Sequence, residues 1–202
     1  GFEIWEWWIE VHREWHEKDG PLDDHSPLTI FVSVGDGNII SGIHKGFKDL
    51  YQLGWLPRMP RIIGVQAEGS AAISNAFHAG TETIIPVSAK TIADSISVDL
   101  PRDGVRAVRA TKETGGTYVN VSDEEILKAI AELGTLGVFA EPAGATAYAG
   151  LVKAVGSGAV GSEDPILVLN TGSGLKDVRA AMQAVPSAPI IEPTLEAVKR
   201  LL

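Results

Sequence analysis

The stretch Leu28-Thr-Ile-Phe-Val-Ser-Val34, followed at once by Gly35-Asp-Gly-Asn38, decides how the chain is interpreted. A short, largely apolar and β-branched run predicts a strand that is buried on both faces. The glycine-rich residues end that strand. Apolar residues at helical spacing then predict a helix over Ile39–Leu53. A strand that passes through a short glycine loop into a helix is typical of α/β proteins.

The same alternation of strands and helices continues toward the C-terminus. Further strands are expected at Arg61–Ala67, Thr117–Val121, Gly137–Ala140 and Pro165–Asn170, with a short one at Thr83–Pro86. Further helices are expected at Ser70–His78, Val105–Lys112, Glu124–Leu133, Ala143–Val155, Leu175–Ala184 and Thr194–Leu202. Ser122 and Glu125 have the spacing of a capping box before one of them. The predicted fold class is therefore α/β, with a mostly parallel open sheet flanked by helices.

The first residues differ from the rest of the chain. Four of the five Trp and three of the five His lie within the first thirty positions. Helical spacing predicts a helix over Glu3–Lys18, which Gly20-Pro21 would end, and Leu22–Pro27 reads as a polar turn. We therefore expect an atypical aromatic helix and turn over residues 1–28, and one α/β domain over residues 29–202.

Composition excludes several classes of protein. The 202 residues carry 17 Lys and Arg against 26 Asp and Glu, a net charge of −9. This balance argues against a surface for nucleic acid or anionic membrane, since both need clustered cations. The absence of Cys rules out disulfides, Cys-ligated zinc and iron–sulfur clusters. The longest uncharged run, Gly69–Thr81, is too short to span a bilayer, and no secretory signal is visible, so we expect a cytoplasmic protein.

Two glycine-rich loops are the first candidates for a ligand site, because parallel sheets bind ligands where strands end and helices begin. In the first loop, Gly35–Asn38, glycines let the backbone approach a ligand, and the following helix offers unpaired N–H groups that suit a phosphate. Asp36 would repel an anion unless its side chain points away. The alternative is a plain turn in which Asn38 caps the helix.

The second loop is Asn170-Thr-Gly-Ser-Gly174, which places the Thr171 hydroxyl after an expected strand, at the rim that would face a ligand. The alternative is an ordinary glycine-rich turn. Glu141 follows another expected strand and could also face a ligand. Alternatively, Glu141 caps the next helix, which Pro142 suits as a first residue.

Other catalytic patterns are poorly supported. His12 and His16 have the i, i+4 spacing of a metal site, but Arg13 breaks the zincin pattern and a third ligand is not evident. We therefore expect no metal. A nucleophile elbow of the type Gly-x-Ser-x-Gly is also missing, which argues against a Ser-His-Asp hydrolase.

From about Thr29 to Leu202 the chain resembles the threonine synthases, a family of tryptophan-synthase-like, fold type II enzymes that depend on pyridoxal 5'-phosphate (PLP). Several stretches carry the resemblance in the family's order: Val32–Gly42, Ile63–Ser70, Ala93–Val98, Gly137–Pro142 and Leu169–Asp177. The opening Gly1–Glu6 also looks like a family stretch, whereas the residues from Trp7 to Leu28 do not.

The resemblance implies a fold, a cofactor and roles for individual residues. The fold would be the large domain of a PLP enzyme, in incomplete form. Gly35, Asp36, Gly37, Asn38 and the backbone of Ile39 would cradle the cofactor phosphate. Thr171 would hydrogen-bond the pyridine nitrogen, and Glu141 would lie near the ring. The implied reaction converts O-phospho-L-homoserine, a phosphorylated amino acid, and water to L-threonine and phosphate.

The chain departs from the family in one important respect. The family's Schiff-base lysine lies well upstream of the glycine loop, and this sequence shows no such segment. Lys48 lies about three turns into the helix after the loop, out of reach of the cofactor aldehyde, so we reject it for that role. The chain thus looks like a C-terminal portion of the enzyme, without a catalytic residue of its own, and we expect little turnover from it alone.

Three alternatives stay open at this point. The chain could belong to another enzyme of the same fold, such as a threonine or serine dehydratase. It could be a non-catalytic module, or a half that pairs with a complementary N-terminal chain carrying the lysine. It could also be a truncated reading frame without a selected function. A homodimer is compatible with an open sheet, and the aromatic N-terminal helix, with Trp5, Trp8 and Trp15, would cover part of the apolar surface.

Overall fold

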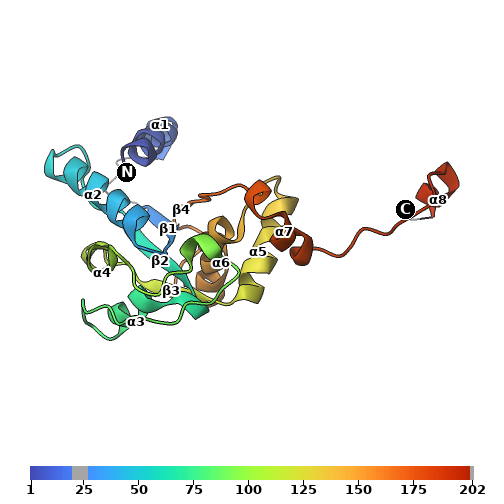
Figure 1. The fold of residues 1–202 in the computed structure, drawn as a ribbon. Helices are drawn as coiled ribbons and strands as arrows, with labels where there is room; N and C mark the ends of the chain where they lie inside the picture. Colours follow the sequence, from blue (N-terminus) through green and yellow to red (C-terminus); the bar gives the residue numbers. More distant parts are fainter. Residues whose placement is uncertain (20–26, 201–202) are drawn as a thin grey trace.

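The computed structural model describes residues 1–19 and 27–200, and only the backbone of residues 12–19. Four strands and a series of helices alternate along the chain (Figure 1). The strands are β1 (Thr29–Ser33), β2 (Arg61–Ala67), β3 (Tyr118–Val121) and β4 (Ile166–Val168). The α-helices are α1 (Phe2–Asp19), α2 (Asn38–Gln52), α3 (Ala72–His78), α4 (Gly104–Glu113), α5 (Asp123–Thr135), α6 (Pro142–Gly156), α7 (Val178–Ala184) and α8 (Leu195–Lys199). Short 3-10 turns occur at Glu68–Ser70, Asp94–Ile96 and Gly174–Lys176.

The four strands form one parallel sheet in the order β3-β2-β1-β4. All five residues of β1 are buried, as a central strand requires. The chain runs from β1 to β2 on one side, while β4 pairs with β1 on its other side. The predicted fold class, an α/β protein with a parallel sheet flanked by helices, is therefore confirmed.

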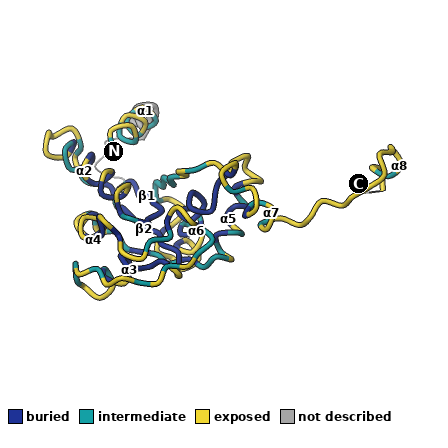
Figure 2. The backbone as a smooth tube through the Cα atoms, in the orientation of Figure 1, coloured by how far each residue is buried: buried dark blue, intermediate teal, exposed yellow. Residues whose placement is uncertain are grey.

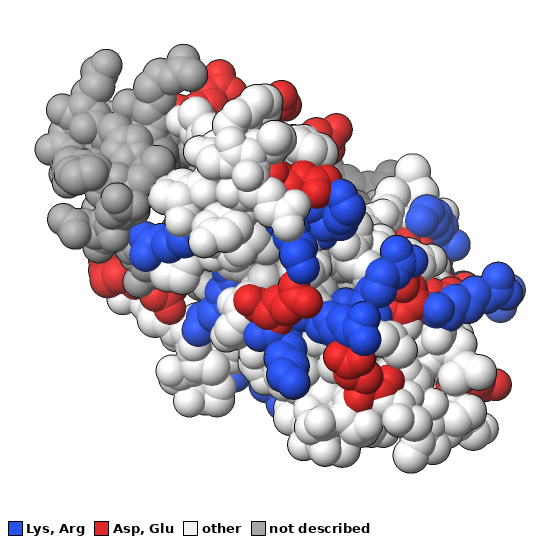
Figure 3. All heavy atoms as spheres, turned by 90° about the vertical axis from the view of Figure 1, so that its left-hand side faces the viewer, with Lys and Arg blue, Asp and Glu red and all other residues white. Residues whose placement is uncertain are grey.

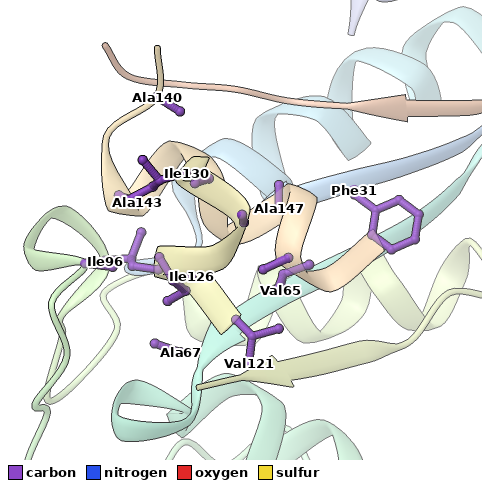
Figure 4. Packing of buried hydrophobic residues seen from close by; sticks show 14 of the residues in the cluster. Phe31, Val65, Ala67, Ile96, Val121, Ile126, Ile130, Ala140, Ala143 and Ala147 are labelled. Atoms are coloured by element: carbon purple, nitrogen blue, oxygen red, sulfur yellow. The ribbon is translucent and has the colours of Figure 1, made fainter. Parts of the chain in front are cut away.

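Helices cover both faces of the sheet, and strand alternation divides the core between them. Phe31 packs with Val65 and Val121 against α5 and α6 on one face (Figure 4). Ile30 and Val32 point to the opposite face, where they pack against α2, α3 and α4. The tube view shows the same distribution, with β1 and β2 almost wholly buried (Figure 2).

Most expected elements are present, within a few residues of their predicted ends. The expected helix over Glu124–Leu133 is α5, and its capping box is confirmed: the Ser122 hydroxyl accepts from the N–H of Glu125, whose carboxylate accepts from the N–H of Ser122. Pro142 is the first residue of α6, as expected.

Two predicted strands are wrong. Residues 83–86 have no regular structure. Pro86 has no N–H to donate to a neighbouring strand, which disfavours a strand at this position. Gly137–Ala140 contributes only one antiparallel bridge, between Ala140 and Ser173. Gly137 has a φ of 80° and immediately follows the end of α5, so this segment is a helix-ending turn with a short bridge.

Two other predictions need adjustment. The expected buried strand Pro165–Asn170 is shortened to β4, which is half-buried because it forms an edge of the sheet. The expected helix Leu175–Ala184 is split into the 3-10 turn Gly174–Lys176 and α7, because Asp177 adopts a non-helical conformation and its carboxylate caps α7.

The N-terminal helix α1 packs on the main body. Ile4, Trp5 and Trp8 lie against the core cluster on the α2 side of the sheet, and Trp5 stacks on Trp55 with ring centroids 5.5 Å apart. The side chains of His12, Trp15 and His16 fall outside the described part of the chain, as do Gly20-Pro21 and most of the expected turn. Within the described residues, we find no helix with the length and hydrophobicity needed to cross a membrane.

The C-terminal helix α8 is shorter than predicted within the described residues and lies away from the sheet (Figure 1). None of its residues is buried. It takes no part in positioning the candidate site.

Candidate cofactor site

The two glycine-rich loops meet because the strands before them are neighbours. β1 leads into Gly35–Asn38, and β4 leads into Asn170–Gly174. β1 and β4 pair in parallel, so their carboxyl ends lie at the same edge of the sheet. The chain leaves these two ends toward different helices, which creates the crevice where open α/β sheets bind ligands.

The first loop delivers the N-terminus of α2 to this crevice. Gly37 is the residue before the helix and has a φ of 92°, a left-handed conformation that favours glycine. A Cβ on Gly37 would also lie 2.9 Å from the Ala107 Cβ. No side chain caps α2, so its first N–H groups are available to an external acceptor. The alternative in which Asn38 caps the helix is therefore wrong, since Asn38 is its first helical residue.

Asp36 is held by the segment that precedes α4. Its carboxylate accepts a hydrogen bond from the N–H of Arg102 at 3.0 Å, and its carbonyl accepts one from the N–H of Asp103 at 2.9 Å. One oxygen of the carboxylate is thereby tied to a neighbouring loop, which reduces its repulsion toward an anion bound by the α2 N–H groups.

Glu141 lies at the start of α6, but its side chain makes no capping hydrogen bond. Its Oε1 lies instead 3.0 Å from Nζ of Lys176, and its backbone N–H donates to the Gly172 carbonyl at 3.0 Å. A Cβ on Gly172 would lie 1.7 Å from Oε1 of Glu141, so only glycine permits this approach. The Glu141 carboxylate is buried in direct contact with the loop that carries Thr171.

These residues line one cavity of about 300 Å³. Every candidate that the sequence predicted borders it: Gly35, Asp36, Gly37, Asn38, Ile39, Thr171 and Glu141. The structure therefore brings together three segments that are separated by up to about 135 positions in the sequence. A cavity of this volume that borders helix N–H groups, a hydroxyl and a carboxylate suits a small ligand with an anionic group.

Sequence reasoning missed several residues that line the cavity. Ser95 and Ile96 reach it from the 3-10 turn Asp94–Ile96, and Ala143 reaches it from α6. Lys176 is the single cation among the described residues that line it. Lys176 lies only five positions after Thr171. Its closeness to the second glycine-rich loop was therefore the sequence signal that could have identified Lys176 as a cavity residue.

Lys48 lies outside this cavity, as the sequence indicated. Its Nζ pairs with Oε2 of Glu113 on α4 at 2.8 Å, and this hydrogen bond holds the pKa of the Glu113 carboxyl below its ordinary value. Other lysines and arginines on the α2–α4 side are likewise interspersed with carboxylates rather than gathered in one basic patch (Figure 3).

Comparison with known proteins identifies the family. Residues 1–172 match the family model described as pyridoxal-phosphate dependent enzyme. The chain therefore belongs to the pyridoxal-phosphate dependent enzymes. PLP, the cofactor that the sequence predicted, is the cofactor of this family.

The expected resemblance to threonine synthases is also confirmed. The chain is 34% identical over 183 residues to a threonine synthase of Methanosarcina acetivorans. The aligned region covers 90% of this chain and 45% of the relative. The chain is 36% identical over 178 residues to a threonine synthase of Methanocaldococcus jannaschii, covering 87% and 44%. The chain thus spans less than half the length of these relatives.

Solved structures support the fold. A processed threonine deaminase isoform 2 from Solanum lycopersicum superimposes with a TM-score of 0.62 at 23% identity, covering 87% of this chain and 47% of that one. Threonine synthase from Escherichia coli gives a TM-score of 0.56 at 20% identity, covering 89% and 40%.

The residues at the cavity fit the family's cofactor. Gly37 takes the left-handed conformation that leads into α2, and the uncapped start of α2 supplies donors for a phosphate. Thr171 and the buried Glu141 border the same cavity and would offer a hydroxyl and a carboxylate to the pyridine ring.

Proposed function

We propose that this chain binds PLP in the cavity between β1 and β4, as part of an enzyme that carries out the threonine synthase reaction. One observation carries the proposal: all seven predicted cofactor-binding residues border a single cavity. The similarity to threonine synthases over most of the chain supports the choice of reaction.

Each segment has a distinct part in this proposal. The N–H groups of Gly35–Ile39 bind the cofactor phosphate at the positive end of α2. Thr171 hydrogen-bonds the pyridine nitrogen through its hydroxyl and keeps that nitrogen largely unprotonated. Glu141 lies beside the ring and contributes a fixed charge. When bound, PLP supplies an electron sink for the substrate's carbanion.

The complete reaction converts O-phospho-L-homoserine and water to L-threonine and phosphate. We propose that this chain carries it out together with the part of its relatives that it does not span. Phosphate release and threonine formation from O-phospho-L-homoserine would support the assignment. Release of ammonia and a 2-oxo acid from threonine or serine would instead assign the protein to the dehydratases.

Cofactor binding can be tested on the chain itself with pyridoxamine phosphate, which cannot react with lysines. We expect calorimetry to detect binding of pyridoxamine phosphate and much weaker binding of pyridoxamine, which lacks the phosphate. Gly37→Ala should reduce the affinity by roughly tenfold or more, because the new Cβ requires a left-handed conformation and displaces the α2 N–H groups.

Two comparisons make this test specific. Gly115 also has a positive φ, but a Cβ there would meet open space, so Gly115→Ala controls for backbone strain away from the cavity. Thr171→Ser should bind almost as tightly as the wild type, whereas Thr171→Val should bind more weakly. Equal affinity for pyridoxamine and pyridoxamine phosphate would contradict the proposed phosphate site.

A further inference from the structure

The ion pair between Lys176 and Glu141 joins two segments of the cavity wall. Glu141 immediately precedes α6, and Lys176 ends the 3-10 turn Gly174–Lys176. Nζ of Lys176 lies 3.0 Å from Oε1 of Glu141. The two side chains differ greatly in exposure, with relative accessibilities of 61% for Lys176 and 6% for Glu141. A solvated ammonium therefore covers a buried carboxylate at the cavity rim.

The loop between them is shaped around this carboxylate. Glu141 Oε1 occupies the space that a side chain at position 172 would fill, and the Glu141 N–H donates a hydrogen bond to the Gly172 carbonyl. On the other side, a Cβ on Gly144 would lie 2.4 Å from Oδ1 of Asn170. The loop that carries Thr171 is thus packed directly onto the first turn of α6, with Lys176 closing the contact.

The charges at the cavity explain why such a pair is needed. Among the described lining residues, Asp36 and Glu141 are acidic and Lys176 is basic. A doubly acidic cavity without Lys176 would repel a phosphorylated ligand, and a buried carboxylate without a partner is costly. Glu141 is the more deeply buried of the two acids, so it is the carboxylate for which a charged partner matters most.

We propose that Lys176 is a positioning residue that acts through Glu141: its ammonium neutralises this buried carboxylate, so that the cavity accepts an anionic cofactor. The inference rests on the proposed function, since it assumes that pyridoxamine phosphate and PLP bind here. It assigns Lys176 no direct contact with the cofactor.

Three variants separate this role from a direct contact. Lys176→Met makes the cavity more negative, and we expect the affinity for pyridoxamine phosphate to fall roughly five- to tenfold. Glu141→Gln makes it less negative, and the affinity should exceed that of the wild type. The double variant carries the same net cavity charge as the wild type, so its affinity should return to within about twofold of the wild-type value.

Two further variants complete the experiment. Lys176→Arg keeps the charge and should rescue binding. Lys153→Met is a matched control, because Lys153 also loses ion pairs, with Glu125 and Glu68, but lies outside the cavity. Its affinity for pyridoxamine phosphate should not change. Circular dichroism of each variant establishes that the fold is kept.

Each other result overturns the inference in a recognisable way. If Lys176→Met binds as tightly as the wild type, Lys176 has no role in binding. If the double variant is as weak as Lys176→Met, Lys176 contacts the ligand itself rather than acting through Glu141. If the wild-type chain binds no pyridoxamine phosphate, the proposed function fails and the inference fails with it.

Discussion

The carboxylate of Asp36, in the loop Gly35–Asn38, accepts a hydrogen bond at 3.0 Å from the backbone N–H of Arg102, 66 positions further along the chain. The contact ties the loop after β1 to the segment before α4, which a second hydrogen bond from Asp103 N–H to the Asp36 carbonyl strengthens. An acidic residue at this position is thus used to hold the loop, although its charge opposes the binding of an anion.

This relationship predicts opposite effects on binding and stability. Asp36→Asn keeps an oxygen that can accept from Arg102 but removes the negative charge, so the affinity for pyridoxamine phosphate should rise roughly threefold. Asp36→Ala removes the acceptor as well, and the free energy of unfolding should fall by about 1 kcal/mol. Calorimetry and urea denaturation measure the two effects.

Asp164→Asn is the matched control for Asp36→Asn. Asp164 also accepts a backbone N–H, from Gly161 at 2.8 Å, but lies in a surface loop away from the cavity. An increase in affinity for both variants would show that net charge alone, and not the position of Asp36, governs binding.

Gln66 links the end of β1 to the start of α3. Its side chain is buried; Nε2 donates to the Val34 carbonyl at 3.1 Å, and Oε1 accepts from the Ser74 N–H at 2.8 Å. Gln66→Leu keeps a similar volume but leaves both backbone groups without this partner, so the free energy of unfolding should fall by about 2–4 kcal/mol. Urea denaturation measures the loss. Gln52→Leu, at the exposed end of α2, should leave stability within about 0.5 kcal/mol of the wild type.

Tyr118 makes the stability sensitive to alkaline pH. Burial raises the pKa of its phenol well above the ordinary value, and the hydroxyl donates to the Ala107 carbonyl at 3.0 Å. The unfolded chain releases this proton near pH 10, while the folded chain retains it. Its contribution is therefore fully present below about pH 10 and is lost progressively above that value.

Tyr118→Phe should lower the free energy of unfolding by about 1 kcal/mol at neutral pH, because the hydrogen bond to Ala107 is lost. Above about pH 10 the difference from the wild type should shrink, since the variant has no phenol to titrate. Urea denaturation of the variant and of the wild type, at neutral pH and above about pH 10, measures this difference in the free energy of unfolding. Tyr51→Phe, at a half-exposed position, serves as the control. A difference that is constant with pH would contradict the assignment.

The stacking of Trp5 on Trp55 predicts that α1 contributes to stability. Their ring centroids are 5.5 Å apart with an interplanar angle of 23°. Trp5→Ala should reduce the free energy of unfolding by about 1–2 kcal/mol through loss of this stack and of buried apolar area. Trp7→Ala, at an exposed position of the same helix, should have a much smaller effect. If the two variants are equal, α1 does not stabilise the domain through its packed face.

Local sequence patterns predicted the central strands and the glycine loop well. β1 and β2 lie in the centre of the sheet, where both faces are covered, so continuous apolar runs identify them. The capping box of Ser122 and Glu125 was equally readable, because it involves residues only three positions apart. The rule that ligands bind at the carboxyl ends of parallel strands then directed attention to the two loops that do border one cavity.

The segment Gly137–Ala140 shows where such patterns fail. Its short apolar run resembles a strand, but Val138 and Phe139 are partly exposed and only Ala140 makes a bridge. Whether an apolar run becomes a strand depends on a neighbouring strand to pair with, and that neighbour is decided by the fold as a whole.

The sequence by itself determined the fold class, the family and the loops that form the candidate site, because these depend on residue types at short and regular spacings. Only the tertiary structure decided that Lys176 neutralises Glu141, that Gln66 joins β1 to α3, and that Asp36 is held by Arg102. Charged and polar side chains form these contacts wherever folding brings them together, and no local spacing in the sequence specifies which partners will meet.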